Sequence, residues 1–499
     1  MEKLEFQDDH LDPTVEVSLE AVKSRAVKGV AVLTGRTFLL SILSLVATGF
    51  LTVFLNPSEF GVFWIISAVV NFLAYFSDVG LAAALIQKKE NVNSEELKTT
   101  FTIQQLLVVL LLVILFAATP FLQRYYAFGD EGKLLLYALG ISLLMSSLKT
   151  IPSVLLEREL DFPKLVFPQV LENLAYNLVA VYFAWKGFGI RSFTYAVLVR
   201  GFVGLVGIYL MKPWMPGISF AKKPLKKLLN FGVPYQLNTF LAVVKDDGLT
   251  AFLGGILGTA GIGFLGWAQK WSQYPLRLFM DHVLKVTFPA FSRMQDDERE
   301  LSQSVTRAIF FVCFLVFPAV AGLLIIAPIL VEIIPKYDKW RPALIPLMLI
   351  SVNTFFAAGT TQLTNLLNAI GKIRITFKLM VMWTTLTWGL VPYLALKHGV
   401  NGAGLGYAIV GTSSIVAIFA AYRQVKFNIF SSMIVPLFGT LVMISALLLL
   451  KMFLPVNLTS IWVLISVGGL VYAIVMQIFV GKSIWQDAKR ATKLVFKRN

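Results

Sequence analysis

The chain has 499 residues, of which 57% are hydrophobic and only 14% carry a charged side chain. Soluble domains contain about 25% charged residues, so this composition excludes a soluble enzyme or binding domain. It predicts an all-α membrane protein that crosses the bilayer many times. The net charge of +16 would suggest a nucleic-acid partner for a soluble chain. In a membrane protein, basic cytoplasmic loops account for that charge, and we expect no nucleic acid among the partners.

Cysteine and histidine are too scarce to form a disulfide framework or a zinc site. The one cysteine, Cys313, lies in an apolar run and is expected to be a small buried thiol. The three histidines, His10, His282 and His398, belong to no HExxH motif, and the chain has no CxxC motif. We therefore expect neither a bound metal nor a cofactor.

Residues 1–33 form a polar lead-in, and the later part of this segment is amphipathic. Such a segment is typical of a helix that lies at the cytoplasmic surface of a membrane. Residues 1–20 are acidic and polar and lack the apolar core of a cleavable signal peptide. We expect the first membrane span to be retained and the amino terminus to remain in the cytoplasm.

Fourteen apolar stretches, each long enough to cross a bilayer, follow the lead-in. Six form a predicted first lobe at residues 34–211, and six form a second lobe at 228–422. A cytoplasmic linker rich in Pro, Gly and Lys joins the lobes at 212–227. The last two stretches occupy 429–481 and precede a basic cytoplasmic tail at 482–499. The predicted spans are 34–55, 60–87, 99–120, 133–156, 165–185, 190–211, 228–256, 262–288, 305–333, 342–369, 375–396, 402–422, 429–452 and 459–481.

The loops between the spans support this topology. With the amino terminus inside, the predicted cytoplasmic segments carry roughly three times as many Lys and Arg residues as the external loops. This bias places both termini in the cytoplasm. Glycine-containing turns recur in the two lobes, at 56–61 and 258–263 and again at 186–190 and 397–402, which indicates an internal repeat.

One predicted span carries polar residues along a single side of its helix. At about 100° per residue, these residues fall within an arc of roughly 120°. A charge at bilayer depth costs at least about 2.5 kcal/mol, so such a stripe is expected to line a hydrated cationic cavity. Alternatively, Arg277 and Asp281, four residues apart, only neutralise each other inside the bundle. We call this set the basic stripe: Lys270, Gln273, Tyr274, Arg277, Asp281 and Lys285.

A second polar cluster, Lys245-Asp246-Asp247, lies ahead of several glycines in the seventh predicted span. Successive residues of a helix turn by about 100°, so the three side chains cannot share one face. A broken or flexible helix is therefore expected here. One carboxylate of the cluster is a candidate to bind a coupling ion, a proton or Na⁺. The alternative is a Lys–Asp pair with one further acid at the membrane interface.

Three further charged residues lie in the first lobe. Asp78 ends the second predicted span, and we expect it to have a structural or gating role. Glu172 and Lys149 are expected to pair with each other or to snorkel within the lobe. The candidate ion-coupling or gating residues of the whole chain are Asp78, Asp246, Asp247 and Asp281.

Five short motifs resemble those of a known family. They are Arg-Ala-Val-Lys-Gly at 25–29, Leu-Asn-Pro-Ser-Glu-Phe-Gly at 55–61, Asp-Val-Gly-Leu at 78–81, Leu-Leu-Glu-Arg-Glu-Leu-Asp-Phe at 155–162 and Gly-Phe-Gly at 187–189. Together they resemble the polysaccharide transporters of the multidrug/oligosaccharidyl-lipid/polysaccharide flippase superfamily, over nearly the whole chain. Members of that family often carry an arginine just before the Pro-x-x-Phe-Gly turn, where this chain has Val53 or Phe54.

The resemblance implies a V-shaped, MATE-like transporter of two six-helix lobes plus two carboxy-terminal helices, which alternates access across the membrane. The implied cargo is a polyprenyl-diphosphate-linked oligosaccharide repeat unit, flipped during the assembly of exopolysaccharide, capsule or O-antigen. The implied location is a bacterial or archaeal cytoplasmic membrane. Its lipid bilayer and other polysaccharide-assembly membrane proteins are the candidate partners, and the protein would not be an enzyme.

For such a cargo, cations suit the diphosphate and an aromatic ring suits the sugars. The candidate substrate-binding residues are therefore Arg36, Lys245, Lys270, Tyr274, Arg277 and Lys285. A multidrug or cation exporter of the same fold is one alternative, but its cavity would be expected to be acidic or apolar. A membrane glycosyltransferase or polymerase would need a larger external loop than this chain has. Transport of the peptidoglycan precursor is a further alternative.

Overall fold

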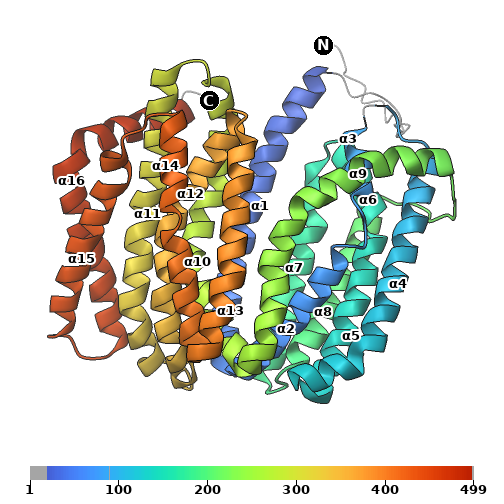
Figure 1. Ribbon diagram of the computed structural model, residues 1–499, viewed down its shortest axis with the longest axis horizontal. Helices are drawn as coiled ribbons and strands as arrows, with labels where there is room; N and C mark the ends of the chain where they lie inside the picture. Colours follow the sequence, from blue (N-terminus) through green and yellow to red (C-terminus); the bar gives the residue numbers. More distant parts are fainter. Residues whose placement is uncertain (1–18, 89, 497–499) are drawn as a thin grey trace, which may run out of the picture. The chain divides into compact units, whose positions relative to one another are not determined.

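The computed structural model describes the backbone of residues 19–88 and 90–496. Side chains are described in the same ranges except at 19–34, 223–224, 227, 234–235, 237–239, 281–282 and 482–496. Over these residues the regular secondary structure is helical, which confirms the predicted all-α class (Figure 1). The side chains of the predicted lead-in, 1–33, and of the predicted tail, 482–499, lie outside the described residues.

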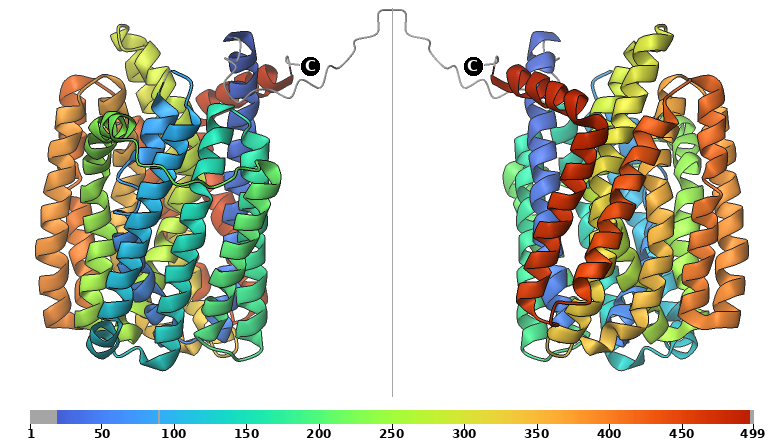
Figure 2. Two further views of the ribbon diagram at one scale, coloured as in Figure 1. Left: turned by 90° about the vertical axis from the view of Figure 1, so that its right-hand side faces the viewer. Right: turned by 90° about the vertical axis from the view of Figure 1, so that its left-hand side faces the viewer.

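The chain divides into two compact units, Met1–Gly255 and Ile256–Asn499. Within each unit the helices run side by side (Figure 2). The predicted linker at 212–227 precedes this division, and the predicted domain boundaries stay a prediction. The first unit contains α1 (Leu19–Phe54), α2 (Pro57–Ala74), α3 (Leu81–Gln87), α4 (Ser94–Tyr126), α5 (Gly129–Leu148), α6 (Thr150–Arg158), α7 (Phe162–Trp185), α8 (Arg191–Met211), α9 (Lys222–Val243) and the π-helical turn η1 (Val244–Gly248).

The second unit begins inside α10 (Leu249–Arg293), whose first turns belong to the first unit. The backbone of α10 leaves the helical conformation at Gly258, with φ of 68° and ψ of 179°. Residues with a Cβ rarely adopt positive φ, so this glycine permits the break expected between spans 228–256 and 262–288. The other elements are α11 (Glu298–Ile333), η2 (Asp338–Ala343), α12 (Leu344–Ala369), α13 (Ile373–Thr412), α14 (Ile415–Gln424), η3 (Phe430–Ile434), α15 (Val435–Lys451) and α16 (Leu458–Phe496).

A second break lies within α13 at Gly399, where φ is 58°. It falls between the predicted spans 375–396 and 402–422. Over the described residues, eleven helical stretches are long and apolar enough to cross a membrane, and two of them contain the breaks at Gly258 and Gly399. The helix α7, which carries Glu172, is not among them. The count of fourteen spans stays a prediction.

Local side-chain bonds explain where two of the helices begin. Asn93 Oδ1 accepts a hydrogen bond from the Glu96 backbone N–H at 2.8 Å, and Glu96 Oε2 accepts one from the Asn93 N–H at 3.1 Å. This reciprocal capping satisfies two N–H groups that no helical carbonyl reaches, and it begins α4. At α2, Pro57 occupies the first turn and Glu59 Oε2 accepts a hydrogen bond from the Asn56 N–H at 2.6 Å.

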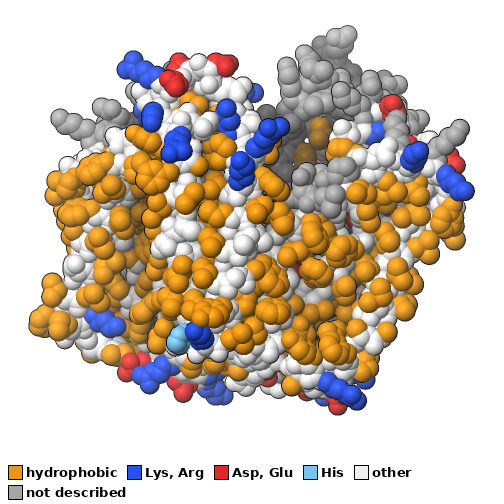
Figure 3. All heavy atoms as spheres, in the orientation of Figure 1, with side chains coloured by type: hydrophobic (Ala, Val, Ile, Leu, Met, Phe, Trp, Pro, Cys, Tyr) orange, Lys and Arg blue, Asp and Glu red, His pale blue; other side chains and the backbone are white. Residues whose placement is uncertain are grey.

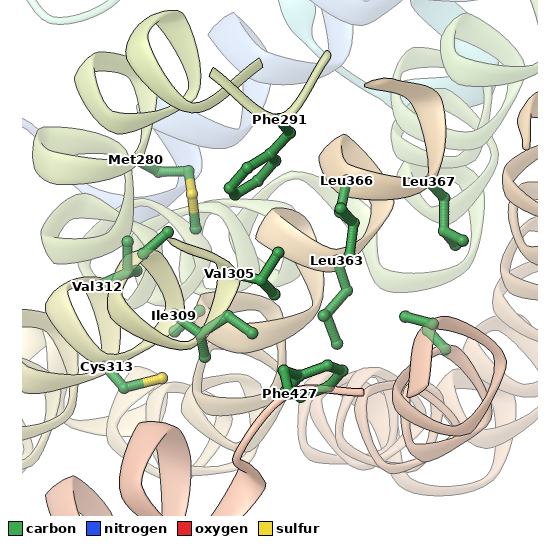
Figure 4. Close-up of a cluster of buried hydrophobic side chains, with 14 of the residues drawn as sticks. Met280, Phe291, Val305, Ile309, Val312, Cys313, Leu363, Leu366, Leu367 and Phe427 are labelled. Carbon is green, nitrogen blue, oxygen red and sulfur yellow. The ribbon is translucent and has the colours of Figure 1, made fainter. Parts of the chain in front are cut away.

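The core of the second unit is a cluster of buried apolar side chains from α10, α11, α12, α13 and α14 and from the segment that follows α14 (Figure 4). On α11, Val305, Ile309, Val312 and Cys313 recur at helical spacing and are all 0% exposed. The prediction of a buried thiol at Cys313 is thereby confirmed. Inside a lipid bilayer, close van der Waals packing of this kind is a main stabilising contribution.

The outer faces of the helices are apolar. Large hydrophobic side chains are exposed on α4, α8 and α16, for example Phe121, Leu210 and Ile478. On the face shown in Figure 3, hydrophobic side chains cover the flanks of the helices, while charged side chains gather towards the helix ends. A lipid environment accounts for this distribution, because hydrocarbon tolerates exposed apolar groups but not exposed charges.

Gly406 on α13 provides a test of the packing in the second unit. A Cβ added there would lie 2.8 Å from Val391 Cα, a contact that only a backbone movement relieves. We expect Gly406→Ala to lower the free energy of unfolding by about 1–3 kcal/mol. A Cβ added at Gly389 has no heavy atom within 4 Å. Gly389→Ala should therefore be neutral or stabilise the protein by up to about 1 kcal/mol. Equal midpoints in thermal unfolding of the two purified variants would contradict this packing.

Candidate functional site

The basic stripe lies on the carboxy-terminal half of α10, in the second unit. Gln273 and Tyr274 are half-buried, and the side chain of Asp281 lies outside the described residues. The cations of the stripe are exposed: Lys270, Arg277 and Lys285. The accessible side of α10 is therefore positively charged.

The opposite side of α10 is held in the core of the unit by hydroxyl groups. Ser272 Oγ lies 2.7 Å from Thr354 Oγ1 and 3.1 Å from Ser351 Oγ, both on α12. Further along, Thr287 Oγ1 accepts a hydrogen bond from Asn365 Nδ2 at 3.0 Å. Inside a bilayer such groups find partners only within the protein, so these contacts fix the rotation of α10 about its axis. The exposed cations consequently face away from α12.

Some aromatic rings beside the stripe belong to the core. Trp267 stacks on Trp340 with 5.6 Å between the ring centroids and 16° between the planes. Its Nε1 donates a hydrogen bond to the Tyr337 hydroxyl at 3.3 Å, and only 3% of Trp267 is exposed. Trp271 and Tyr274 are half-buried and remain partly accessible. Trp271 and Tyr274 are thus the aromatic rings near the stripe that a ligand could reach.

Arg277 contacts a neutral neighbour on the same helix. Its Nη2 donates a hydrogen bond to Gln273 Oε1 at 3.2 Å. An amide carries no charge, so this contact orients the guanidinium group without neutralising its positive charge. The alternative pairing with Asp281 involves a side chain outside the described residues, and it stays a prediction.

The cluster Lys245-Asp246-Asp247 lies in the first unit, in η1. Lys245 forms an ion pair with its neighbour Asp246. Asp247 Oδ1 accepts a long hydrogen bond of 3.5 Å from Asn71 Nδ2 on α2. A π-helical turn is a rare irregularity that often marks a functional site, and an irregular helix is what the sequence predicts here. Asp247 is thus the acid of this cluster that does not pair with Lys245, and its role in binding a coupling ion stays a prediction.

Asp78 lies in the turn between α2 and α3, beyond the end of the candidate span Pro57–Ala74. The Ala82 backbone N–H donates to both of its carboxylate oxygens at 3.2 Å, at the start of α3. Burial raises the pKa of the Asp78 carboxyl, and the hydrogen bond from Ala82 partly opposes that shift. A carboxylate at a helix amino terminus is favourable, so this geometry agrees with a structural role. Gating by Asp78 stays a prediction.

The candidate substrate-binding residues are shared between the units. Arg36 and Lys245 belong to the first unit, whereas the members of the basic stripe belong to the second. Arg36 lies beside Glu172, close enough for a direct electrostatic interaction. Lys149 Nζ lies 2.6 Å from Glu172 Oε2, which confirms the predicted pairing of these two residues.

Two features of the first unit are not among the predictions made from the sequence. Arg158 donates through Nη1 to the Lys88 carbonyl at 2.8 Å and through Nη2 to the Glu90 carbonyl at 3.0 Å. It thereby closes the loop after α3, and the motif at 155–162 is the sequence signal for it. The second feature is a cavity of about 330 Å³. Its polar lining consists of Ser146, Lys149, Thr150, Ser153, Glu157, Gln169 and Glu172.

Residues 50–345 match the model of a family described as polysaccharide biosynthesis protein. The chain belongs to this family. It is 24% identical over 458 residues to an uncharacterized membrane protein in the cps region of Klebsiella pneumoniae, covering 88% of this chain and 93% of that protein. It is also 24% identical over 392 residues to the lipopolysaccharide biosynthesis protein WzxC of Escherichia coli K12, covering 77% of this chain and 78% of that protein.

This polysaccharide biosynthesis family member also shares its fold with a solved structure of the lipid II flippase MurJ in an inward closed conformation. The TM-score is 0.72 at 17% identity, over 91% of this chain and 99% of that chain. At this identity the likeness shows the fold alone. With the family match, it confirms the predicted relation to the polysaccharide transporters of the multidrug/oligosaccharidyl-lipid/polysaccharide flippase superfamily.

If the basic stripe of this family member faces water, cysteines placed on it will react with a charged, membrane-impermeant thiol reagent. We expect Lys270→Cys and Arg277→Cys to be labelled in permeabilised cells, because a thiol must meet water to react as the thiolate. Ala268→Cys, on the buried side of α10, should stay unlabelled. The buried Cys313 makes the unmodified chain a suitable background. Equal labelling at Ala268 and Arg277, or no labelling of either stripe position, would exclude a hydrated stripe.

Proposed function

We propose that this chain is a flippase that moves polyprenyl-diphosphate-linked oligosaccharide repeat units across the cytoplasmic membrane of a bacterium or archaeon. Such units serve the assembly of exopolysaccharide, capsule or O-antigen, and both termini of the chain lie in the cytoplasm in this proposal. The observation that carries it is the exposed set of cations on α10, in a member of a polysaccharide biosynthesis family.

The proposed cargo has three parts with different physical needs. Its lipid tail can stay in hydrocarbon, whereas its glycan and diphosphate need a polar route across the membrane. Arg277 can hold a phosphate through two parallel N–H···O bonds, while Lys270 and Lys285 act as point charges. Tyr274 offers an aromatic ring to a sugar of the same cargo. One side of one helix thus supplies both kinds of contact.

Alternating access is proposed from the division of the chain into two compact units. The break of α10 at Gly258 follows this division closely in the chain, and glycine at positive φ provides a joint with little steric cost. A proton or Na⁺ is the proposed coupling ion, and Asp247 in η1 is one candidate carboxylate for it. Other membrane proteins of polysaccharide assembly are the proposed partners.

The charge of the basic stripe argues against the alternative of a multidrug or cation exporter. Two like charges about 4 Å apart repel by about 4 kcal/mol at an effective dielectric constant of about 20. A cationic drug near Lys270, Arg277 and Lys285 would meet this repulsion, whereas a diphosphate would be attracted. The names of the relatives point the same way, to a lipopolysaccharide for WzxC and to lipid II for MurJ.

Arg277→Ala tests this proposal in cells that rely on the chain for an exported polysaccharide. A hydrogen bond to a charged group contributes about 1.5–3 kcal/mol, so losing it should reduce export by roughly tenfold or more. The variant should still insert in the membrane in normal amounts. Arg277→Lys keeps the charge but loses the bidentate fork, and we expect partial export. Exported polysaccharide per cell and the amount of inserted protein are measured.

Arg374→Ala is the matched control, because it removes an exposed cation of the second unit that lies outside the stripe. We expect this variant to export polysaccharide normally. Normal export by Arg277→Ala, or an equal loss in Arg374→Ala, would defeat the assignment of the stripe as the cargo site.

A further inference from the structure

The first unit contains an ion pair whose position requires an explanation. Lys149 Nζ lies 2.6 Å from Glu172 Oε2, and only 19% and 10% of the two side chains are exposed. Lys149 lies between α5 and α6, and Glu172 lies within α7. Burying two charges costs several kcal/mol per ion, so apolar residues would often stabilise a bundle at least as well. A charge pair inside a membrane helix bundle is therefore a candidate functional site.

A glycine on a third helix, α8, leaves space for this ion pair. On α8, a Cβ added at Gly204 would lie 2.0 Å from Glu172 Oε2 and 2.8 Å from Lys149 Nζ. Any larger residue at this position would push the carboxylate away from the ammonium group. The glycine thus allows the contact to form against the backbone of α8.

Other charged groups surround Glu172. Arg36 on α1 interacts with it electrostatically, and the buried Nε of Arg36 has no hydrogen-bond partner among the described residues. On α8, the Arg200 guanidinium lies over the ring of Tyr176, 5.9 Å from its centroid. Glu172 therefore faces two cations, Lys149 and Arg36.

Two more titratable groups lie on elements packed against α7. Glu157 on α6 lines the same cavity as Glu172. The Tyr209 hydroxyl on α8 donates a hydrogen bond to the Leu148 carbonyl at 3.1 Å. Neither group takes the place of Lys149 beside Glu172, so Lys149 and Arg36 are the cations that contact or face this carboxylate.

The ion pair borders the cavity of about 330 Å³, so water can reach it. One water needs only about 10–15 Å³ of such volume. Ser146, Thr150 and Ser153 contribute to the polar lining, and Gln169 Oε1 has no hydrogen-bond partner among the described residues. This lining offers hydrogen-bonding groups through which a proton can pass between water and Glu172.

We propose that Glu172 is a proton-binding site and that Lys149 is its partner in the ionised state. When helix movement separates Glu172 from both Lys149 and Arg36, its carboxylate becomes a buried, unpaired charge, which is costly enough that it takes up a proton. The proton comes from a hydronium ion in the cavity, which becomes water, and Lys149 keeps its own proton. Renewed contact with Lys149 returns the proton to water. The structure corresponds to the proton-released state.

This inference rests on the proposed flippase function, because proton binding and release in each cycle would supply the driving force for cargo movement. It places the coupling carboxylate in the wall of a cavity of the first unit. A proton requires only the carboxylate.

The first test measures proton binding by the purified full chain in lipid nanodiscs, without cargo. Infrared difference spectra report the carbonyl stretch of protonated carboxyl groups as the pH falls from about 8 to about 5. We expect a signal in the unmodified chain that Glu172→Gln lacks. Glu157→Gln, a control on the same cavity wall, should retain it. Equal signals from the unmodified chain and Glu172→Gln would overturn the proposal.

Gly204→Ala provides a second, independent variant. Its added Cβ displaces Glu172 from Lys149, so we expect the Glu172 signal to appear at a higher pH than in the unmodified chain. Gly207→Ala lies one turn further along α8, and its Cβ would meet Pro168 at 3.1 Å rather than the ion pair. The control should therefore titrate like the unmodified chain, and identical titrations of the two glycine variants would count against the proposal.

The double variant Lys149→Gln/Glu172→Gln distinguishes proton exchange from a purely structural ion pair. Two amides of nearly the same size can hydrogen-bond to each other, so the chain should fold and insert normally. We expect cells with this variant to lose polysaccharide export. Normal export would show that the pair only holds the helices together, and the proton site would then be rejected.

The infrared titration needs no cargo, so the two proposals can fail separately. A Glu172 signal in a chain that moves no lipid-linked glycan would remove the flippase proposal and leave the proton site standing. Glycan movement by a chain without the Glu172 signal would overturn the proposal of a proton site and leave the flippase proposal standing.

Discussion

A charged side chain inside hydrocarbon must either pair within the protein or reach water, and the polar architecture of this chain follows from that constraint. The backbone N–H and C=O groups likewise need partners inside hydrocarbon, and they find them by forming helices. In the first unit, several lysines pair with acids, among them Lys149 with Glu172 and Lys245 with Asp246. In the second unit, the cations of α10 lie on its exposed side, while hydroxyl groups hold the other side in the core.

These two arrangements suit different tasks. An exposed row of cations attracts a mobile anion and releases it again, because water screens exposed charges and keeps each contact weak. A buried pair next to a cavity is held in place until helices move. Its carboxylate can then change its partner or its protonation state. We therefore propose cargo contact at the basic stripe of the second unit and proton exchange at Glu172 in the first unit. Each task has its own charged groups, within one chain.

The helical fold and the basic stripe can be predicted from the sequence because both depend on local regularities. The length of an apolar stretch specifies a span, and the helical period places Lys270 and Arg277 on one side. The break at Gly258 is also local, since glycine tolerates positive φ. The position of Arg36 beside Glu172 is not predictable in this way, because it depends on how α1 packs against α7. The cavity next to Glu172 is lined by five helices, α3, α5, α6, α7 and α8, and leaves no periodic signal in the sequence.

The most direct test of the flippase function is the leaflet distribution of lipid-linked glycans in cells depleted of this chain. Polyprenyl diphosphates that carry a repeat unit are extracted after treatment with a membrane-impermeant reagent, which separates those exposed outside from those protected inside. The proposed function predicts that these lipids accumulate on the cytoplasmic face. Accumulation of single repeat units already exposed outside, or no accumulation together with hypersensitivity to cationic drugs, would contradict it.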